Sequence, residues 1–83
     1  MYLGIKTVKP LMNYRLELTF DNSEVKIFDL SSYLETGLFS ELKDYDLFKQ
    51  VRISFDTIEW PNGADLDPEI LYIESKEAVG HVV

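Results

Sequence analysis

The segment Tyr14–Asp21 alternates strictly between apolar and polar side chains, and this pattern restricts the fold more than any other. Its apolar positions are Tyr14, Leu16, Leu18 and Phe20. Successive side chains of a strand point to opposite faces, so the pattern predicts a strand with one face on a core and the other in water. Other elements of the chain must cover the apolar face.

Apolar residues resume after Asn22-Ser23, at Val25 and Ile27. A two-residue loop at Asn22-Ser23 would set Phe20 opposite Val25 and Leu18 opposite Ile27, so that the apolar residues of both strands share a face. Asn22 tolerates the left-handed conformation that such turns require. The sequence therefore predicts a hairpin with this register.

A second alternating segment, Val51–Phe55, is followed by Asp56-Thr57. A two-residue turn there predicts a second hairpin in which Phe55 stands opposite Ile58, and Ile53 opposite Trp60. Trp60, the only tryptophan of the chain, is then a core-face residue with an aliphatic cross-strand partner.

Shorter signals predict elements before and between these hairpins. A first strand over residues 3–8 is expected to end before Lys9-Pro10, because proline cannot donate to a ladder. Ser32 and Glu35 have the spacing of a capping box, which predicts one short helix ended by Gly37.

Apolar residues then recur at three- and four-residue intervals between residues 38 and 51. Asp44 suits a cap better than a helix interior, so two short helices are expected to meet near it.

The last helix has the clearest start signal. Pro61 and Asn62-Gly63 stop the preceding strand. Asp67 is then expected as the N-cap, with Pro68 as the first helical residue and Glu69 complementing the helix dipole. Ile70, Leu71 and Ile73 are expected to form the apolar face of this helix.

Together these elements predict a single α+β domain over residues 1–76, in the order β-β-β-α-α-β-β-α. Antiparallel hairpins and short helices packed on one sheet face are expected. Residues 77–83 are expected to form a C-terminal tail that either frays or adds an edge strand.

Composition excludes several function classes. The 83 residues include no cysteine, which excludes disulfides, thiolate nucleophiles and cysteine zinc sites and fits a reducing compartment. The start of the chain lacks a signal-peptide pattern and no apolar run has membrane-spanning length, so a cytoplasmic protein is expected. The net charge of −7 disfavours nucleic-acid binding and favours a basic protein partner; solubility alone is the simpler reading of the charge.

The chain resembles the DUF2442 family, a small bacterial domain of unknown function. The resemblance covers nearly the whole chain to about Glu74 and implies a compact α+β domain, with no established activity. It also implies neighbours or fusion partners among other small bacterial domains, in settings similar to toxin–antitoxin pairs. The family often has Asp-Gly in the first hairpin turn and Gly in the second, where this chain has Asn22-Ser23 and Asp56-Thr57. The residues that carry the resemblance are Leu16–Asp21, Phe28–Leu30, Phe39–Leu42, Phe48 and, most specifically, Ile58–Glu69.

Few side chains suggest chemistry. Asp65, Asp67 and Glu69 place carboxylates at alternate positions, but a cap and a dipole explain two of them, and the spacing is not that of an EF-hand. Neither a metal nor a cofactor is therefore expected. His81, the only histidine, lies near the terminus without a recognisable catalytic partner.

Three functions remain open. The leading hypothesis is a non-catalytic interaction module, the acidic partner of a small basic protein in a toxin–antitoxin-like pair. The alternative is a small-ligand or enzyme domain that uses a notch around Trp60, Asn62, Asp65 and Tyr72, although the hairpin register favours a core role for Trp60. The third is a homodimer formed through an exposed sheet edge.

Overall fold

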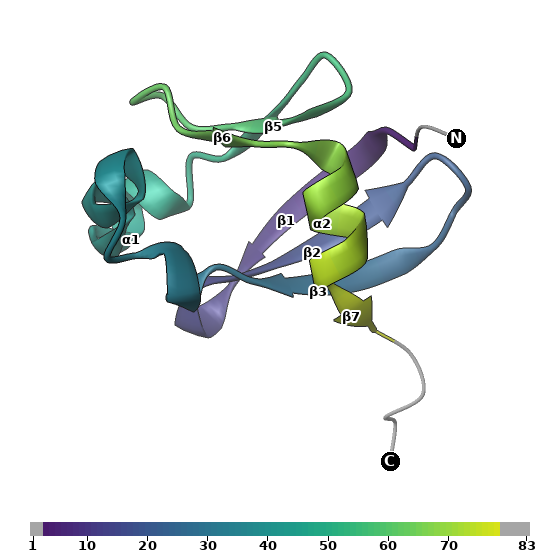
Figure 1. Cartoon of the computed structure of the whole chain (residues 1–83), viewed down its shortest axis with the longest axis horizontal. Coiled ribbons are helices and arrows are strands. Elements are labelled where there is room, and N and C mark those ends of the chain that lie inside the picture. The colour runs from purple at the N-terminus through teal and green to yellow at the C-terminus, as the bar shows by residue number, and fades with distance from the viewer. Residues whose placement is uncertain (1–2, 79–83) are drawn as a thin grey trace.

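The first three strands form an antiparallel sheet that is completed by a short strand from the C-terminal end. The computed structural model describes residues 3–78. The strand order is β1-β2-β3-β7, and a single 3-10 turn, η1, joins β1 to β2 (Figure 1). The bounds are Ile5–Leu11 for β1, Met12–Tyr14 for η1, Arg15–Phe20 for β2, Val25–Asp29 for β3 and Lys76–Glu77 for β7. β7 is thus an added edge strand, and residues 79–83 of the expected tail lie outside the described residues.

β1 is longer than the sequence predicts. It does not end before Lys9-Pro10 but continues to Leu11, with Pro10 opposite Leu16. β1 is an edge strand, where the missing N–H of a proline is tolerated. A register shift between Ile5 and Thr7 places an extra residue in β1, which explains why its apolar residues do not alternate regularly.

The first hairpin forms, but its predicted register is wrong by one residue. Thr19, not Phe20, stands opposite Val25, and Leu18 stands opposite Lys26. The loop has three residues, since the backbone N–H of Phe20 donates to the carbonyl of Glu24 at 2.9 Å. Ser23, rather than Asn22, takes the left-handed conformation, with a φ of 72°. As a result, Glu24 and Lys26 lie on the face of β3 that also carries the buried Phe28.

Three short helices follow β3. They are η2 (Ser31–Tyr33), η3 (Gly37–Lys43) and α1 (Tyr45–Phe48), and the first two are 3-10 helices. The predicted capping box of Ser32 and Glu35 is wrong. The side chain of Asp29, not that of Ser32, accepts from a backbone N–H at the start of η2, that of Ser31, at 2.9 Å. The junction at Asp44 is confirmed: its carboxylate caps α1 by accepting from the N–H of Asp46 at 3.1 Å.

The second hairpin belongs to a separate three-stranded sheet with the order β4-β5-β6. Its turn is Phe55-Asp56, not Asp56-Thr57, so Ile53 pairs with Ile58 and Trp60 lies beyond the end of β5. Phe55 is therefore not paired but lies at the tip, 98% exposed and with a φ of 57°. The bounds are Arg52–Ser54 for β4, Thr57–Glu59 for β5 and Asp65–Leu66 for β6.

The last helix, α2 (Pro68–Glu74), starts as predicted. The carboxylate of Asp67 accepts from the N–H of Glu69 at 2.8 Å, and Pro68 occupies the first turn. The predicted apolar face is only partly right. Leu71 is fully buried, whereas Ile70 is 38% and Ile73 is 76% exposed. Within residues 3–78, no helix is long and apolar enough to cross a membrane.

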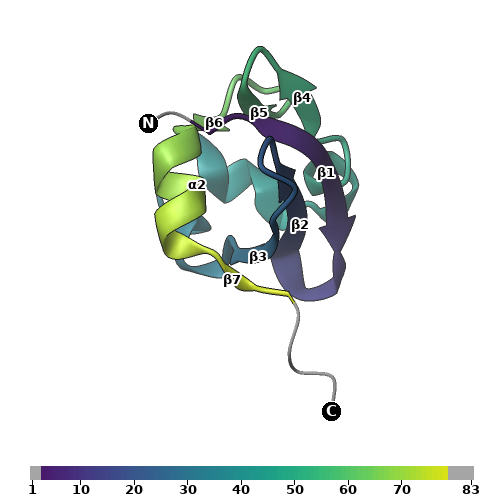
Figure 2. The same cartoon turned by 90° about the vertical axis from the view of Figure 1, so that its right-hand side faces the viewer.

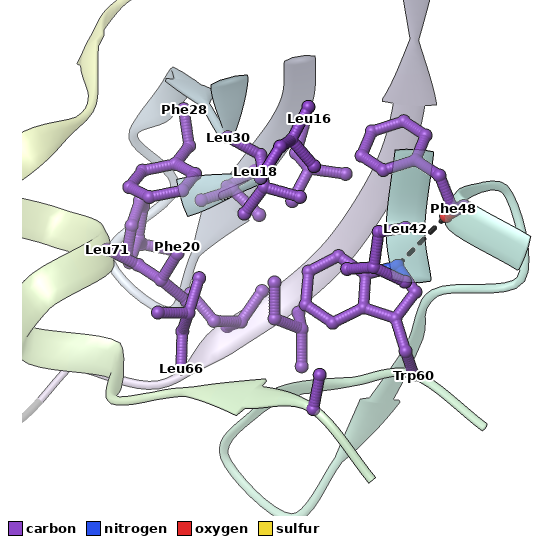
Figure 3. Close-up of a cluster of buried hydrophobic side chains, with 14 residues drawn as sticks. Leu16, Leu18, Phe20, Phe28, Leu30, Leu42, Phe48, Trp60, Leu66 and Leu71 are labelled. Carbon is purple, nitrogen blue, oxygen red and sulfur yellow. Dashed lines mark hydrogen bonds between the residues drawn. The ribbon is translucent and has the colours of Figure 1, made fainter. Parts of the chain in front are cut away.

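The core lies between the four-stranded sheet, the short helices and α2, with the second sheet at one end (Figure 2). Its largest members are Trp60, Phe20, Phe28 and Phe48 (Figure 3). The α+β class and the single domain are confirmed, and the predicted order of elements is found with η1, a third short helix after β3, β6 and β7 added.

Gly4 joins the two sheets. Its carbonyl accepts from the N–H of Asp21 at 3.0 Å, and the next residue, Ile5, donates to the carbonyl of Asp56 at 2.9 Å. A Cβ at Gly4 would lie 2.9 Å from the Asp21 carboxylate and 3.1 Å from the Asp56 Cβ. The start of β1 thus fits between the tips of both hairpins only because residue 4 has no side chain.

Candidate functional site

Trp60 is a core residue, as the sequence favoured. It is fully buried, and its indole N–H donates to the carbonyl of Phe48 at 2.9 Å (Figure 3). Its ring stacks on Phe48 with centroids 6.4 Å apart and meets Phe39 edge-on at 6.2 Å. Aromatic rings, rather than the predicted aliphatic strand partner, therefore hold the indole.

Asn62 connects the turn after Trp60 to the short helices. Its Oδ1 accepts from the N–H of Ala64 at 3.0 Å, and its Nδ2 donates to the carbonyl of Leu38 at 3.1 Å and to the carboxylate of Glu41 at 2.9 Å. These bonds give Asn62 a structural role that its sequence position did not reveal. Asp65 is exposed in β6, opposite Glu59.

Tyr72 lies at a different place, on α2. Its ring meets Phe20 edge-on at 5.0 Å, and its hydroxyl donates to the carboxylate of Glu24. The Nζ of Lys26 lies 3.9 Å from the centre of the Tyr72 ring and donates to the Tyr72 carbonyl at 2.8 Å. Tyr72 therefore has its own partners on β2 and β3, separate from those of Asn62.

Glu24 is the centre of a small polar network beside Tyr72. Asn22 accepts from the N–H of Glu24 at 3.0 Å and donates to its carboxylate at 2.8 Å. The hydrogen bond from Tyr72, followed by that from Asn22, lowers the pKa of Glu24 from its ordinary value of 4.5. The same bond to an anion raises the pKa of Tyr72 above 10.0.

A groove of about 470 Å³ opens beside this network, between α2 and the tip of the first hairpin. We call it the α2 groove. Its walls are mostly apolar, and the exposed Ile73 stands on one side of it. The lining residues are Leu3, Asn22, Pro68, Glu69, Tyr72 and Ile73.

One carboxylate lines the α2 groove, and two more belong to residues next to its lining residues in the chain. Glu69 lines it, and Asp67, the exposed cap of α2, lies two residues before Glu69. Asp21 precedes the lining residue Asn22, and its carboxylate accepts from the N–H of Gly4, next to Leu3, at 3.1 Å. An apolar surface with an acidic rim suits a cationic, amphipathic partner.

The remaining candidate sites give weaker evidence for a functional role. Within residues 3–78, no group of three or more His, Asp or Glu side chains is placed to hold a metal ion, and His81 lies outside that range. A second hollow of about 250 Å³ has walls of mixed charge. Its lining residues are Arg15, Ile27, Asp29, Glu74 and Lys76.

The sequence predicted Tyr72 as a contact residue but gave no indication of the α2 groove that it lines. Leu3, Asn22 and Ile73 are far apart in the chain, and only their tertiary arrangement makes one surface. The detectable signal was Ile73 itself, which falls outside the buried stripe that Pro68 and Leu71 define on α2.

Comparison with known proteins gives one family match. A family model described as "Protein of unknown function (DUF2442)" matches residues 5–77. None of the curated proteins and none of the solved structures matches the chain.

Proposed function

We propose that this chain, which belongs to the DUF2442 family, is a non-catalytic protein-interaction module of the bacterial cytoplasm. In this proposal it is the acidic partner of a small basic protein, in a pair of the toxin–antitoxin type. The observation that carries the proposal is the α2 groove, whose lining combines the exposed apolar side chain of Ile73 with the carboxylate of Glu69.

An exposed apolar side chain supports a binding role. Ile73 is 76% exposed in the α2 groove, whose lining also includes the half-buried Leu3 and the buried Pro68. A contiguous apolar patch with a polar rim is typical of surfaces that a partner covers.

Charge supports a basic partner. The chain carries fifteen acidic and eight basic side chains, a net charge of −7. Opposite charge speeds encounter and rejects like-charged partners, so the acidic rim favours a cationic protein.

A second candidate function is the binding of a small ligand. The α2 groove, at about 470 Å³, falls in the size range of small-molecule sites, which is about 300–1,000 Å³. A ligand screen by thermal shift separates the two functions: a small-molecule site gives a saturable rise in midpoint that Ile73→Ser removes, whereas a protein-binding surface gives none. The notch around Trp60, Asn62 and Asp65 stays a prediction, and Trp60 is fully buried there.

The test of the interaction role is native mass spectrometry of the chain with the product of the adjacent gene, at micromolar concentration. The expected result is a complex with a basic protein that weakens as salt is raised. If no complex forms, or if the neighbouring protein is also acidic, the pairing is wrong. Sedimentation of the chain alone tests the homodimer.

A further inference from the structure

We propose that the α2 groove binds a segment of the partner protein in which apolar side chains are flanked by lysine or arginine. This inference rests on the proposed interaction function and adds the site and the chemistry of its occupant. The apolar side chains of the segment cover Ile73 and Leu3, and its cations face Glu69 and the carboxylates next to the lining residues.

The wall formed by Tyr72 is already ordered without a partner. Its ring packs on Phe20, its hydroxyl is bonded to Glu24, and Lys26 covers its face. Asn22 is likewise bonded to Glu24 twice. Because these polar groups satisfy one another, an occupant loses little by covering them with apolar atoms, and little ordering is needed on binding.

The charges select a cationic segment. Glu69, Asp67 and Asp21 lie on or next to the lining residues. Lys26 donates to the Tyr72 carbonyl and lies over the Tyr72 ring. Its charge is therefore engaged with Tyr72 and does not pair with the carboxylates of the groove. A second copy of the chain would bring another net charge of −7 to an acidic surface, which disfavours self-association here.

The test selects binders for the full chain from displayed random peptides of about twelve residues, long enough to cross the groove at about 3.3 Å per residue. The expected binders carry apolar residues flanked by Lys or Arg. Binding of one such synthetic peptide is then measured by calorimetry, and its footprint by amide chemical shifts of the wild-type chain.

Two variants with a matched control locate the contact. Ile73→Ser is expected to weaken binding about tenfold, equivalent to about 1.4 kcal/mol, and Glu69→Gln about threefold with a smaller salt dependence. Met12→Ser is the control, because Met12 is also 76% exposed but lies in η1, at the other end of β1 and β2. It is expected to bind like the wild type.

The outcomes separate the groove from the function. If the footprint of the selected peptides lies away from Leu3, Asn22 and Ile73, the α2 groove is not the binding site, while the proposed interaction function stands. The same conclusion follows if the peptides bind Ile73→Ser as tightly as the wild type. Neutral or acidic binders overturn the cationic occupant. If no peptide is enriched and the neighbouring gene product does not bind, both proposals fail. A dimer that Ile73→Ser dissociates would instead make a second copy the occupant and overturn the inference.

Discussion

The indole N–H of Trp60 donates to the backbone carbonyl of Phe48 at 2.9 Å, in a site where both side chains are fully buried. The bond joins the end of β5 to the end of α1. It therefore couples the second sheet to the helices that cover the first.

Trp60→Phe should destabilise the fold by about 1–3 kcal/mol, because it removes this donor from a buried acceptor and leaves space beside Phe48. Chemical denaturation monitored by circular dichroism measures the change. Leu38→Ala, at a half-exposed position, is the control and should cost less. Equal losses in the two variants would contradict the role of the indole.

Asn62→Ala should lower the free energy of unfolding by about 1–2 kcal/mol, because the side chain joins the turn to Leu38 and Glu41. Asp65→Ala, three residues away on the exposed side of β6, should stay within about 0.5 kcal/mol of the wild type. Urea titrations of both variants test the contrast. A neutral Asn62→Ala would return this residue to the list of functional candidates.

Gly4→Ala should destabilise the chain by about 1–3 kcal/mol, since the new methyl group would meet the Asp21 carboxylate and the Asp56 side chain. The same change in an Asp21→Ala background should cost less, because one of the close contacts is gone. A double-mutant cycle on unfolding free energies gives the coupling. Strict additivity would show that the crowding at Asp21 is not the cause.

Phe55→Gly should stabilise the chain by about 0.5–1 kcal/mol. A left-handed φ costs a non-glycine residue about 1–2 kcal/mol, which glycine would avoid. The greater freedom of glycine in the unfolded chain offsets part of this gain in stability. The exposed ring of Phe55 makes little packing to lose. Phe55→Ala keeps the strain and is the control. Thermal midpoints that fall for Phe55→Gly would mean that the ring is packed in solution.

Stability should be constant near neutral pH and fall at both extremes. The folded pKa of Glu24 is lowered, so its stabilisation is present above its ordinary pKa of 4.5 and is lost as the pH falls through the lower folded value. The folded pKa of Tyr72 is raised, so its stabilisation is present below 10.0 and is lost as the pH rises through the higher folded value.

Tyr72→Phe should reduce the loss of stability at both extremes, because it removes the bond that shifts both groups. Urea midpoints measured from acid to alkaline pH test this. Tyr33→Phe is the control: Tyr33 donates to Glu74, so its loss leaves the acid limb that comes from Glu24 unchanged. An acid limb of Tyr72→Phe that superimposes on the wild type would contradict the assignment.

The elements whose sequence signals span only a few residues were predicted correctly. The cap at Asp67, the helix junction at Asp44 and the strand over Arg15–Phe20 each depend on neighbours in the sequence, although Tyr14, predicted to begin this strand, lies in η1. Trp60 was correctly predicted to be buried, although its partners are Phe48 and Phe39 rather than Ile53.

Both hairpin registers were wrong for a common reason. Each turn contains a residue, Ser23 or Phe55, that adopts a left-handed conformation without being glycine. Sequence favours Asn or Gly at such positions. The first loop was therefore predicted one residue too short, and the second was given the right length but placed one residue too late. The α2 groove could not be predicted because its lining brings Leu3 and Asn22 together with Tyr72 and Ile73, which lie far along the chain.

The length of the first turn decides which side of β3 faces α2. With one residue fewer in the loop, alternation would turn Val25 and Ile27 toward the helix, and Glu24 and Lys26 toward water. Loss of a single codon, more than any substitution in the groove, would then exchange the side chains that face α2 while leaving every strand in place. Under the proposed interaction role, relatives that keep the α2 sequence but differ in this loop are expected to bind different partners.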